Sequence, residues 1–305
     1  MKYLHALLLQ AFLGLLFCTA LAATIPKAGF FLPDSVHEMT LRYRTAANLI
    51  VLPVLINDSV EVNLILDTGC RNLILFGKKF KNIFPINSGK EIKFSGLGDG
   101  KQVTGLLSLG NKVSIKQVLG EHIPIVIVDN KNVFSSYRNI HGVIGYDIFL
   151  KFEIELNARE NLITFRPAFK SKIPPGYTQI SMQVVDAKPM MNSEIIVSKK
   201  IRRAYDLMID TGSSLGLLLK TTDISVFEHF RNENVLGIGF NGPIRGYETV
   251  SDQLSISGFE INSVPTGIVS SLYHNNGSIG MEVLKNYIVI LNYCKSYACF
   301  KPNTA

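Results

Sequence analysis

Short stretches of alternating apolar and polar residues run through most of this chain, a pattern that predicts β-strands. One stretch covers residues 48–56, reaches a turn at Asn57 and Asp58 and returns through residues 60–63, which is typical of a β-hairpin. A second predicted hairpin lies between residues 193 and 209. Apolar positions at helical spacing extend over one or two turns only, so we expect an all-β fold.

The sequence that closes the first hairpin recurs later in the chain. The letters LILDTGC at residues 64–70 are matched by LMIDTGS at residues 207–213. Each copy is followed by the same series of features, namely a Gly-rich segment, strand-like stretches, an apolar residue and Gly before a short amphipathic stretch, and a closing hairpin. Because the order and the spacing are shared, the sequence predicts two β-rich lobes of similar plan.

A segment rich in Pro and Gly separates the two copies. Residues 171–178 contain the letters PPG, a composition that is typical of a linker. We therefore expect an N-terminal lobe over residues 23–170 and a C-terminal lobe over residues 179–305. The length of 305 residues is compatible with this division, at about 150 residues per domain.

The first 22 residues have the features of a secretory signal peptide. Lys2 provides a positive end, residues 7–17 are almost wholly apolar, and the letters ALA at residues 20–22 match the small residues before a cleavage site. The apolar stretch is too short to span about 30 Å of hydrocarbon as a helix. We expect export to the periplasm or secretion, with no stable membrane insertion after cleavage. An uncleaved anchor is the alternative.

Composition excludes several classes of protein. Charged residues make up 18% of the chain and hydrophobic residues 47%, unlike a disordered protein. The net charge of +7 is spread without a run of five or more like charges, so we expect no nucleic-acid partner. The histidines have no metal-binding spacing, and no metal ion or other cofactor is expected. A Gly-x-Gly-x-x-Gly match at residues 237–242 is followed by Pro243, which favours a hairpin tip over a dinucleotide site.

Three cysteines remain after the predicted cleavage. Cys294 and Cys299 lie close together near the end of the chain and could pair across a small hairpin loop. That pairing would leave Cys70 as a free thiol.

The two Asp-Thr-Gly triplets, each trailed by an apolar-Gly element, resemble those of the aspartic proteases. The resemblance covers both the bilobal pepsin-like enzymes and the retroviral type, which works as a homodimer. More narrowly, residues 48–51, 237–247 and 300–303 are similar to an exported bacterial family of retropepsin-like double-domain proteins. Many of its members carry a PDZ domain after the second lobe, which we do not expect here. The resemblance implies a bilobal acid-protease fold of two retropepsin-like β-barrel lobes, working as a monomer.

The resemblance makes Asp67 and Asp210 a candidate catalytic dyad. Peptide hydrolysis needs a base to take a proton from water and an acid to protonate the departing nitrogen. Two carboxyls within hydrogen-bonding reach share one proton and supply both functions. We therefore expect an aspartic endopeptidase, a hydrolase whose partner is an extended peptide or protein substrate. Because each lobe carries one carboxyl, a lobe alone should be inactive unless it dimerises.

The neighbouring residues of the triplets support the dyad. Gly69 and Gly212 have no side chain and allow backbone N–H groups to approach the carboxylates. Thr68 and Thr211 resemble buried hydroxyls of the family that bond across to the opposite loop.

The residue after each Gly differs between the two copies. Ser213 can donate a hydrogen bond to Asp210, whereas Cys70 is a weaker donor. We interpret Cys70 as a small packed residue rather than a nucleophile, because the neighbouring carboxylate disfavours a thiolate.

The Gly-rich segments are candidates for flaps over a substrate cleft. Glycine allows tight hairpin tips and close contact of the backbone with an extended substrate. The flap candidates are Gly96, Gly98, Gly100, Gly239 and Gly242.

A non-catalytic peptide-binding or assembly protein with the same fold is the alternative function. Cys70 replaces the usual Ser or Ala, and Ser278 stands where an apolar residue is usual before Ile-Gly. Residues 23–48 are short for an inhibitory propeptide.

Overall fold

The structure is a computed structural model that describes residues 27–86, 91–94, 96–129, 134, 137, 139–198, 201–223, 233–256, 258–271 and 276–303. Nearly all elements in these ranges are β-strands, which confirms the expected all-β class. The helices there are the short α2 (Lys78–Ile83), α3 (Tyr146–Phe149) and α4 (Met281–Leu284). None of the described helices is long and apolar enough to cross a membrane. The predicted signal peptide lies outside the described residues.

The N-terminal lobe is built on one sheet that closes on itself. Its strands are β1 (Gly29–Phe31), β3 (Arg44–Ala46), β4 (Leu49–Ile56), β5 (Val60–Leu66), β6 (Leu73–Phe76), β7 (Glu91–Phe94), β8 (Val103–Ile115), β9 (Val118–Val128) and β10 (Gly142–Ile144). They follow the order β1-β9-β6-β10-β5-β4-β8-β7, with β3 beside β4, and the pairing of β8 with β9 closes a barrel. The predicted first hairpin is β4–β5, where Asn57 and Asp58 both have positive φ.

The C-terminal lobe repeats this plan. Its strands are β14 (Gln183–Val185), β15 (Lys188–Ser198), β16 (Ile201–Ile209), β17 (Leu217–Thr221), β18 (Asn234–Gly239), β19 (Gly242–Ile256), β20 (Phe259–Ser270) and β21 (Asn276–Ile279). The order is β14-β15-β16-β21-β17-β20-β19-β18, and the pairing of β15 with β19 closes the second barrel. Two similar β-barrel lobes are therefore confirmed.

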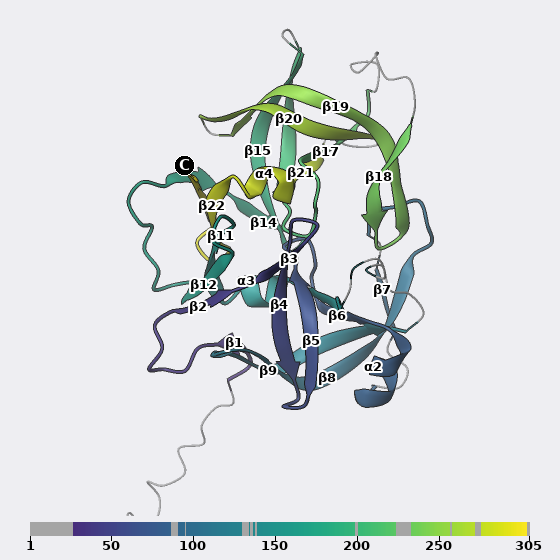
Figure 1. The fold of residues 1–305 in the computed structure, drawn as a ribbon, viewed down its shortest axis with the longest axis vertical. Coiled ribbons are helices and arrows are strands. Elements are labelled where there is room, and N and C mark those ends of the chain that lie inside the picture. The colour runs from purple at the N-terminus through teal and green to yellow at the C-terminus, as the bar shows by residue number, and fades with distance from the viewer. Residues whose placement is uncertain are drawn as a thin grey trace, which may run out of the picture.

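A third sheet joins the lobes. It contains β2 (Met39–Arg42), β11 (Phe152–Asn157), β12 (Leu162–Pro167), β13 (Thr178–Ser181), β22 (Tyr287–Asn292) and β23 (Tyr297–Pro302) in the order β13-β23-β22-β11-β12-β2. The closing hairpins of the two lobes, β11–β12 and β22–β23, meet here through the antiparallel pair β11–β22. In Figure 1 this sheet lies on the left, with the N-terminal barrel below and the C-terminal barrel above.

The three cysteines in the described residues are free thiols. Cys294 and Cys299 therefore do not form the disulfide that their spacing allows. Cys299 is fully buried beside Ile290 and Tyr297, whereas the Cys294 sulfur donates to the Leu150 carbonyl at 2.9 Å. The two side chains have separate environments, and no disulfide links the two ends of the turn between β22 and β23.

Candidate active site

Each Asp-Thr-Gly loop begins at the end of a strand, β5 in the N-terminal lobe and β16 in the C-terminal lobe. Each of these strands pairs with the short strand of its own lobe that ends in Ile just before a Gly, β10 or β21. β10 runs parallel to β5, and the carbonyl of Ile144 accepts a hydrogen bond from Asp67 N at 2.9 Å. In the C-terminal lobe β21 runs parallel to β16, and the carbonyl of Ile279 accepts from Asp210 N, also at 2.9 Å. The same backbone pairing therefore positions both aspartates.

The two loops face each other across the boundary between the lobes. The Asp67 carboxyl lies so close to Gly212 that a Cβ atom at this position would overlap it. Gly69 N donates to Asp67 Oδ1 at 2.7 Å, and Gly212 N donates to Asp210 Oδ1 at 3.0 Å. The structure thus brings the two predicted carboxyls and both predicted glycines to one place.

The two threonines of the triplets cross between the loops. Thr68 Oγ1 donates to the carbonyl of Ile209 at 2.6 Å, and Thr211 Oγ1 donates to the carbonyl of Leu66 at 2.8 Å. Each hydroxyl also accepts from the backbone N–H of the other threonine, at 3.0 and 3.1 Å. Both threonines are fully buried. Their closed network fixes one loop against the other, because no water competes for these hydrogen bonds.

Burial governs the charge of the two carboxyls. It raises the pKa of Asp67 to about 6 and that of Asp210 to about 7. The negative charge of Asp67 raises the pKa of Asp210 further, while the backbone N–H of Gly212, the side chain of Ser278 and the positive charge of Lys188 oppose the shift. Two buried carboxyls that repel each other's charge retain a proton between them. This is the electrostatic condition for one acid and one base at the same site.

The hydroxyl that hydrogen-bonds to the Asp210 carboxyl belongs to Ser278. The Ser213 hydroxyl, which sequence reasoning assigned to this role, instead accepts from a backbone N–H two residues later at 3.3 Å. Cys70 is buried, and its sulfur donates to the carbonyl of Asn72 at 3.0 Å. Burial and the nearby carboxylate raise the pKa of the Cys70 thiol, so the packed, uncharged thiol is favoured.

Tyr293 contacts the Asp67 loop, a role that the sequence pattern did not indicate. Tyr293, which follows β22, is buried and donates from its hydroxyl to the carbonyl of Thr68 at 3.4 Å. Its ring stacks on Phe149 of α3 with 5.1 Å between the centroids. Burial and the charges of Asp67 and Asp210 raise its pKa, so the neutral hydroxyl is retained beneath the dyad.

Asp210→Asn should make the protein more stable near neutral pH. Between about pH 4 and 7 the folded protein keeps a proton on Asp210 that the unfolded chain has released, so stability falls as pH rises through this window. Asn carries no titrating group and avoids this loss. Urea unfolding of both proteins at pH 4 and pH 7 measures the effect. The free energy of unfolding of Asp210→Asn minus that of the wild type should be larger at pH 7 than at pH 4. A difference that does not change with pH would contradict the raised pKa.

The two Gly-rich hairpin tips, β7–β8 and β18–β19, touch each other. Asn241 N donates to the carbonyl of Leu97 at 3.1 Å, and Gly96 N donates to the side chain of Asn241 at 3.0 Å. Asp99 N donates to the carbonyl of Pro243 at 3.0 Å. All the predicted flap glycines lie in this contact; they are Gly96, Gly98, Gly100, Gly239 and Gly242.

Each hairpin tip also packs its apolar side chain against the opposite lobe. Leu97 packs against the cluster of Leu218, Leu236 and Ile244 in the C-terminal lobe. In return, the Phe240 ring lies 5.7 Å from that of Phe76 in β6 and 6.1 Å from that of Phe94. The tips therefore cross over, on the side of the molecule opposite the shared sheet (Figure 1).

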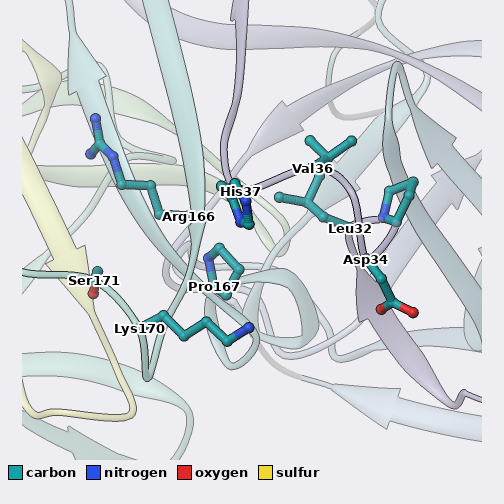
Figure 2. Close-up of a pocket in the computed structure, with 9 residues that line it drawn as sticks. Leu32, Asp34, Val36, His37, Arg166, Pro167, Lys170 and Ser171 are labelled. Atoms are coloured by element: carbon teal, nitrogen blue, oxygen red, sulfur yellow. The ribbon is translucent and has the colours of Figure 1, made fainter.

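A separate cavity of about 490 Å³ shares no residue with this site. Figure 2 shows His37, Arg166 and Lys170 among the side chains that line it. No group of three or more potential metal ligands occurs among the described residues.

Comparison with known proteins identifies the fold. No protein-family model and no curated protein sequence matches the chain. Among solved structures, the aspartic proteinase from Irpex lacteus is similar with a TM-score of 0.59. The match covers 87% of this chain and 97% of that chain, at 11% sequence identity. The chain therefore has the bilobal pepsin-like aspartic-protease fold.

Proposed function

We propose that the protein is an aspartic endopeptidase in which Asp67 and Asp210 form the catalytic dyad. The observation that carries the proposal is the facing pair of Asp-Thr-Gly loops, which places two buried carboxyls of raised pKa on either side of the lobe boundary. A buried pair of this kind is common at catalytic sites.

The two carboxyls divide the chemistry of peptide hydrolysis between them. The ionised carboxyl takes a proton from the attacking water, and the protonated carboxyl stabilises the carbonyl oxygen by a hydrogen bond as it gains charge. Transfer of a proton to the nitrogen then releases the amine. The N–H groups of Gly69 and Gly212 hold the Oδ1 atoms of Asp67 and Asp210 in place throughout. No residue beyond this dyad is needed to move the proton.

The substrate is proposed to lie between the dyad and the hairpin tips. Its extended backbone would pair with the hairpins as an added strand, as in other proteins that bind peptides by strand addition. The tips contact each other directly in the structure, so they must separate to admit a peptide.

We further propose that the protein is a retropepsin-like double-domain enzyme of the exported bacterial type. A covering hairpin from each lobe supports this assignment, as does the similarity of the two barrels. The proposed organisation is a signal peptide over residues 1–22, lobes over residues 23–170 and 179–305, and a linker over residues 171–178. One chain contains both aspartates, so the proposed active form is a monomer in the periplasm or outside the cell.

The direct test is cleavage of a mixed peptide library by the purified full-length protein from about pH 3 to 7, followed by mass spectrometry. We expect new peptide ends that accumulate with time and with protein concentration. Binding of peptides without turnover would contradict the proposal and favour a non-catalytic peptide-binding protein.

Gly100→Ala should impair cleavage by preventing the hairpins from closing. Its Cβ atom would overlap the carbonyl oxygen of Asn241 in the opposite hairpin, and overpacking of this kind costs about 1–3 kcal/mol. We expect kcat/KM to fall roughly tenfold or more. Gly237→Ala is the matched control, because a Cβ atom at that position meets nothing within 4 Å. Equal activity of the two variants would contradict a role for the closed hairpins.

A further inference from the structure

The two lobes differ at a position beside each aspartate. In the N-terminal lobe Val51 is opposite Ile65, so the ladder, continued by two residues, places Leu49 in register with Asp67. In the C-terminal lobe Met190 is opposite Met208. The same continuation places Lys188 in register with Asp210. Leu49 and Lys188 therefore occupy equivalent positions next to the dyad.

A second equivalent pair lies on the neighbouring strands. Leu75 in β6 is opposite Gly142, and Leu219 in β17 is opposite Gly277, so the residues that follow, Phe76 and Lys220, correspond. The ring of Phe76 lies against that of Phe240, which places this position next to the hairpin of the opposite lobe.

The strand pairing orients Lys220 in the same way. Lys220 and Leu218 lie on one face of β17, because side chains alternate along a strand. Leu218 is opposite Ser278, whose hydroxyl hydrogen-bonds to Asp210, and it belongs to the apolar cluster against which Leu97 of the hairpin tip packs. Lys220 therefore shares the face of the C-terminal lobe that borders the dyad.

The charges at the two equivalent pairs differ as well. Leu49 and Phe76 are buried and apolar. Lys220 is half-buried, and its side chain makes no hydrogen bond or ion pair with any residue that the structure describes. Burial and the positive charge of Lys188 lower the pKa of Lys220.

Lys188 has only a weak acidic partner. Its ammonium lies 3.9 Å from one oxygen of Asp186, whose other oxygen is paired with Arg71. The strand register places Lys188 beside Asp210, and its positive charge lowers the pKa of both Asp67 and Asp210. Asp186 carries one negative charge against the two cations Lys188 and Arg71, and Lys220 adds a third positive charge. The dyad keeps one proton and supplies one further negative charge, so positive charge still exceeds negative charge among these groups, which favours an anionic substrate group.

We propose that Lys188 and Lys220 form a cationic subsite that binds an acidic side chain of the substrate. This inference rests on the proposed peptidase function and specifies its substrate class. Peptides with Glu or Asp at the residue that meets the C-terminal lobe are preferred. The equivalent positions of the N-terminal lobe, Leu49 and Phe76, are buried and apolar and carry no charge that would attract an acidic side chain.

The test uses matched peptides that differ only in Glu, Gln, Leu or Lys at each position flanking the cleaved bond. At one position the wild-type protein should prefer Glu over Gln by at least about tenfold in kcat/KM, as expected for hydrogen bonds to charged groups. Lys188→Met and Lys220→Met should each reduce this ratio, while Lys220→Arg, which keeps the charge, should retain it. Lys112→Met, an exposed lysine at the far end of β8, is the control and should leave the ratio unchanged.

The outcomes separate this inference from the proposed function. Equal cleavage of Glu and Gln peptides at every position, or a Glu preference that persists in both Met variants, would overturn the subsite. If the wild-type protein cleaves none of the peptides, the proposed function fails. In that case, Kd values for the same peptides decide the subsite, since tighter binding of Glu than Gln supports it and equal binding overturns it.

Discussion

Asp67→Asn and Asp210→Asn should each reduce the rate of peptide cleavage by at least about 1,000-fold. General acid–base catalysis contributes about 100-fold to 10,000-fold, and each substitution removes a group that serves as acid or base in turn. An amide cannot take the proton from water, and it cannot release one to the departing amine. The remaining carboxyl cannot serve both functions in one turnover, so neither variant should retain partial activity. Initial rates on a single cleaved peptide measure the loss.

Asp206→Asn is the matched control for these variants. Asp206 is an exposed residue of β16, only a few residues before the Asp210 loop. The Asp206→Asn variant should cleave at the wild-type rate. That result would exclude a general loss of activity caused by removing any carboxyl from this strand. A rate within tenfold of the wild type for either dyad variant would show that the dyad is assigned to the wrong residues.

Thr211→Val should cause the largest loss of stability among these substitutions. The valine has nearly the same shape, but it cannot donate to the carbonyl of Leu66 or accept from Thr68 N. Each buried polar group that loses its partner costs about 1–3 kcal/mol, so the free energy of unfolding should fall by about 2–6 kcal/mol. Urea unfolding at a fixed pH measures this difference.

Thr104→Val provides the comparison for this substitution. Thr104 is exposed in β8, and its replacement should change the free energy of unfolding by no more than about 0.5 kcal/mol. A loss below about 1 kcal/mol for Thr211→Val would contradict the account of the crossed threonines. The network would then be replaceable by water, and it could not fix the two loops against each other.

The repeated pattern in the sequence predicted the lobes but not how they join. Local alternation and turn residues are enough to find β4–β5, where Asn57 and Asp58 adopt the positive φ that such a turn requires. These local patterns do not indicate which strand of a closing hairpin pairs with a strand of the other lobe. The β11–β22 pair therefore could not be predicted, because it depends on packing between residues more than a hundred positions apart.

The candidate site divides in the same way. Asp67 and Asp210 could be found because the chemistry is contained in a short motif that occurs twice. Ser278 could not be assigned its hydrogen bond to Asp210, since its contact depends on the register of β21 beside β16. The correspondence of Leu49 with Lys188 also depends on strand register, because the two residues lie at different distances along the chain from their aspartates.

The central claim is that Asp67 and Asp210, one from each lobe, hold one proton between them. Titration of the aspartate side-chain carboxyls by carbon NMR tests it directly, in the wild-type protein and in Asp67→Asn. We predict that Asp210 titrates well above the ordinary range of an aspartate in the wild type, and that its pKa falls in Asp67→Asn because the repelling charge is gone. An Asp210 carboxyl that titrates in the ordinary range, or whose pKa is unaffected by Asp67→Asn, would contradict the shared site.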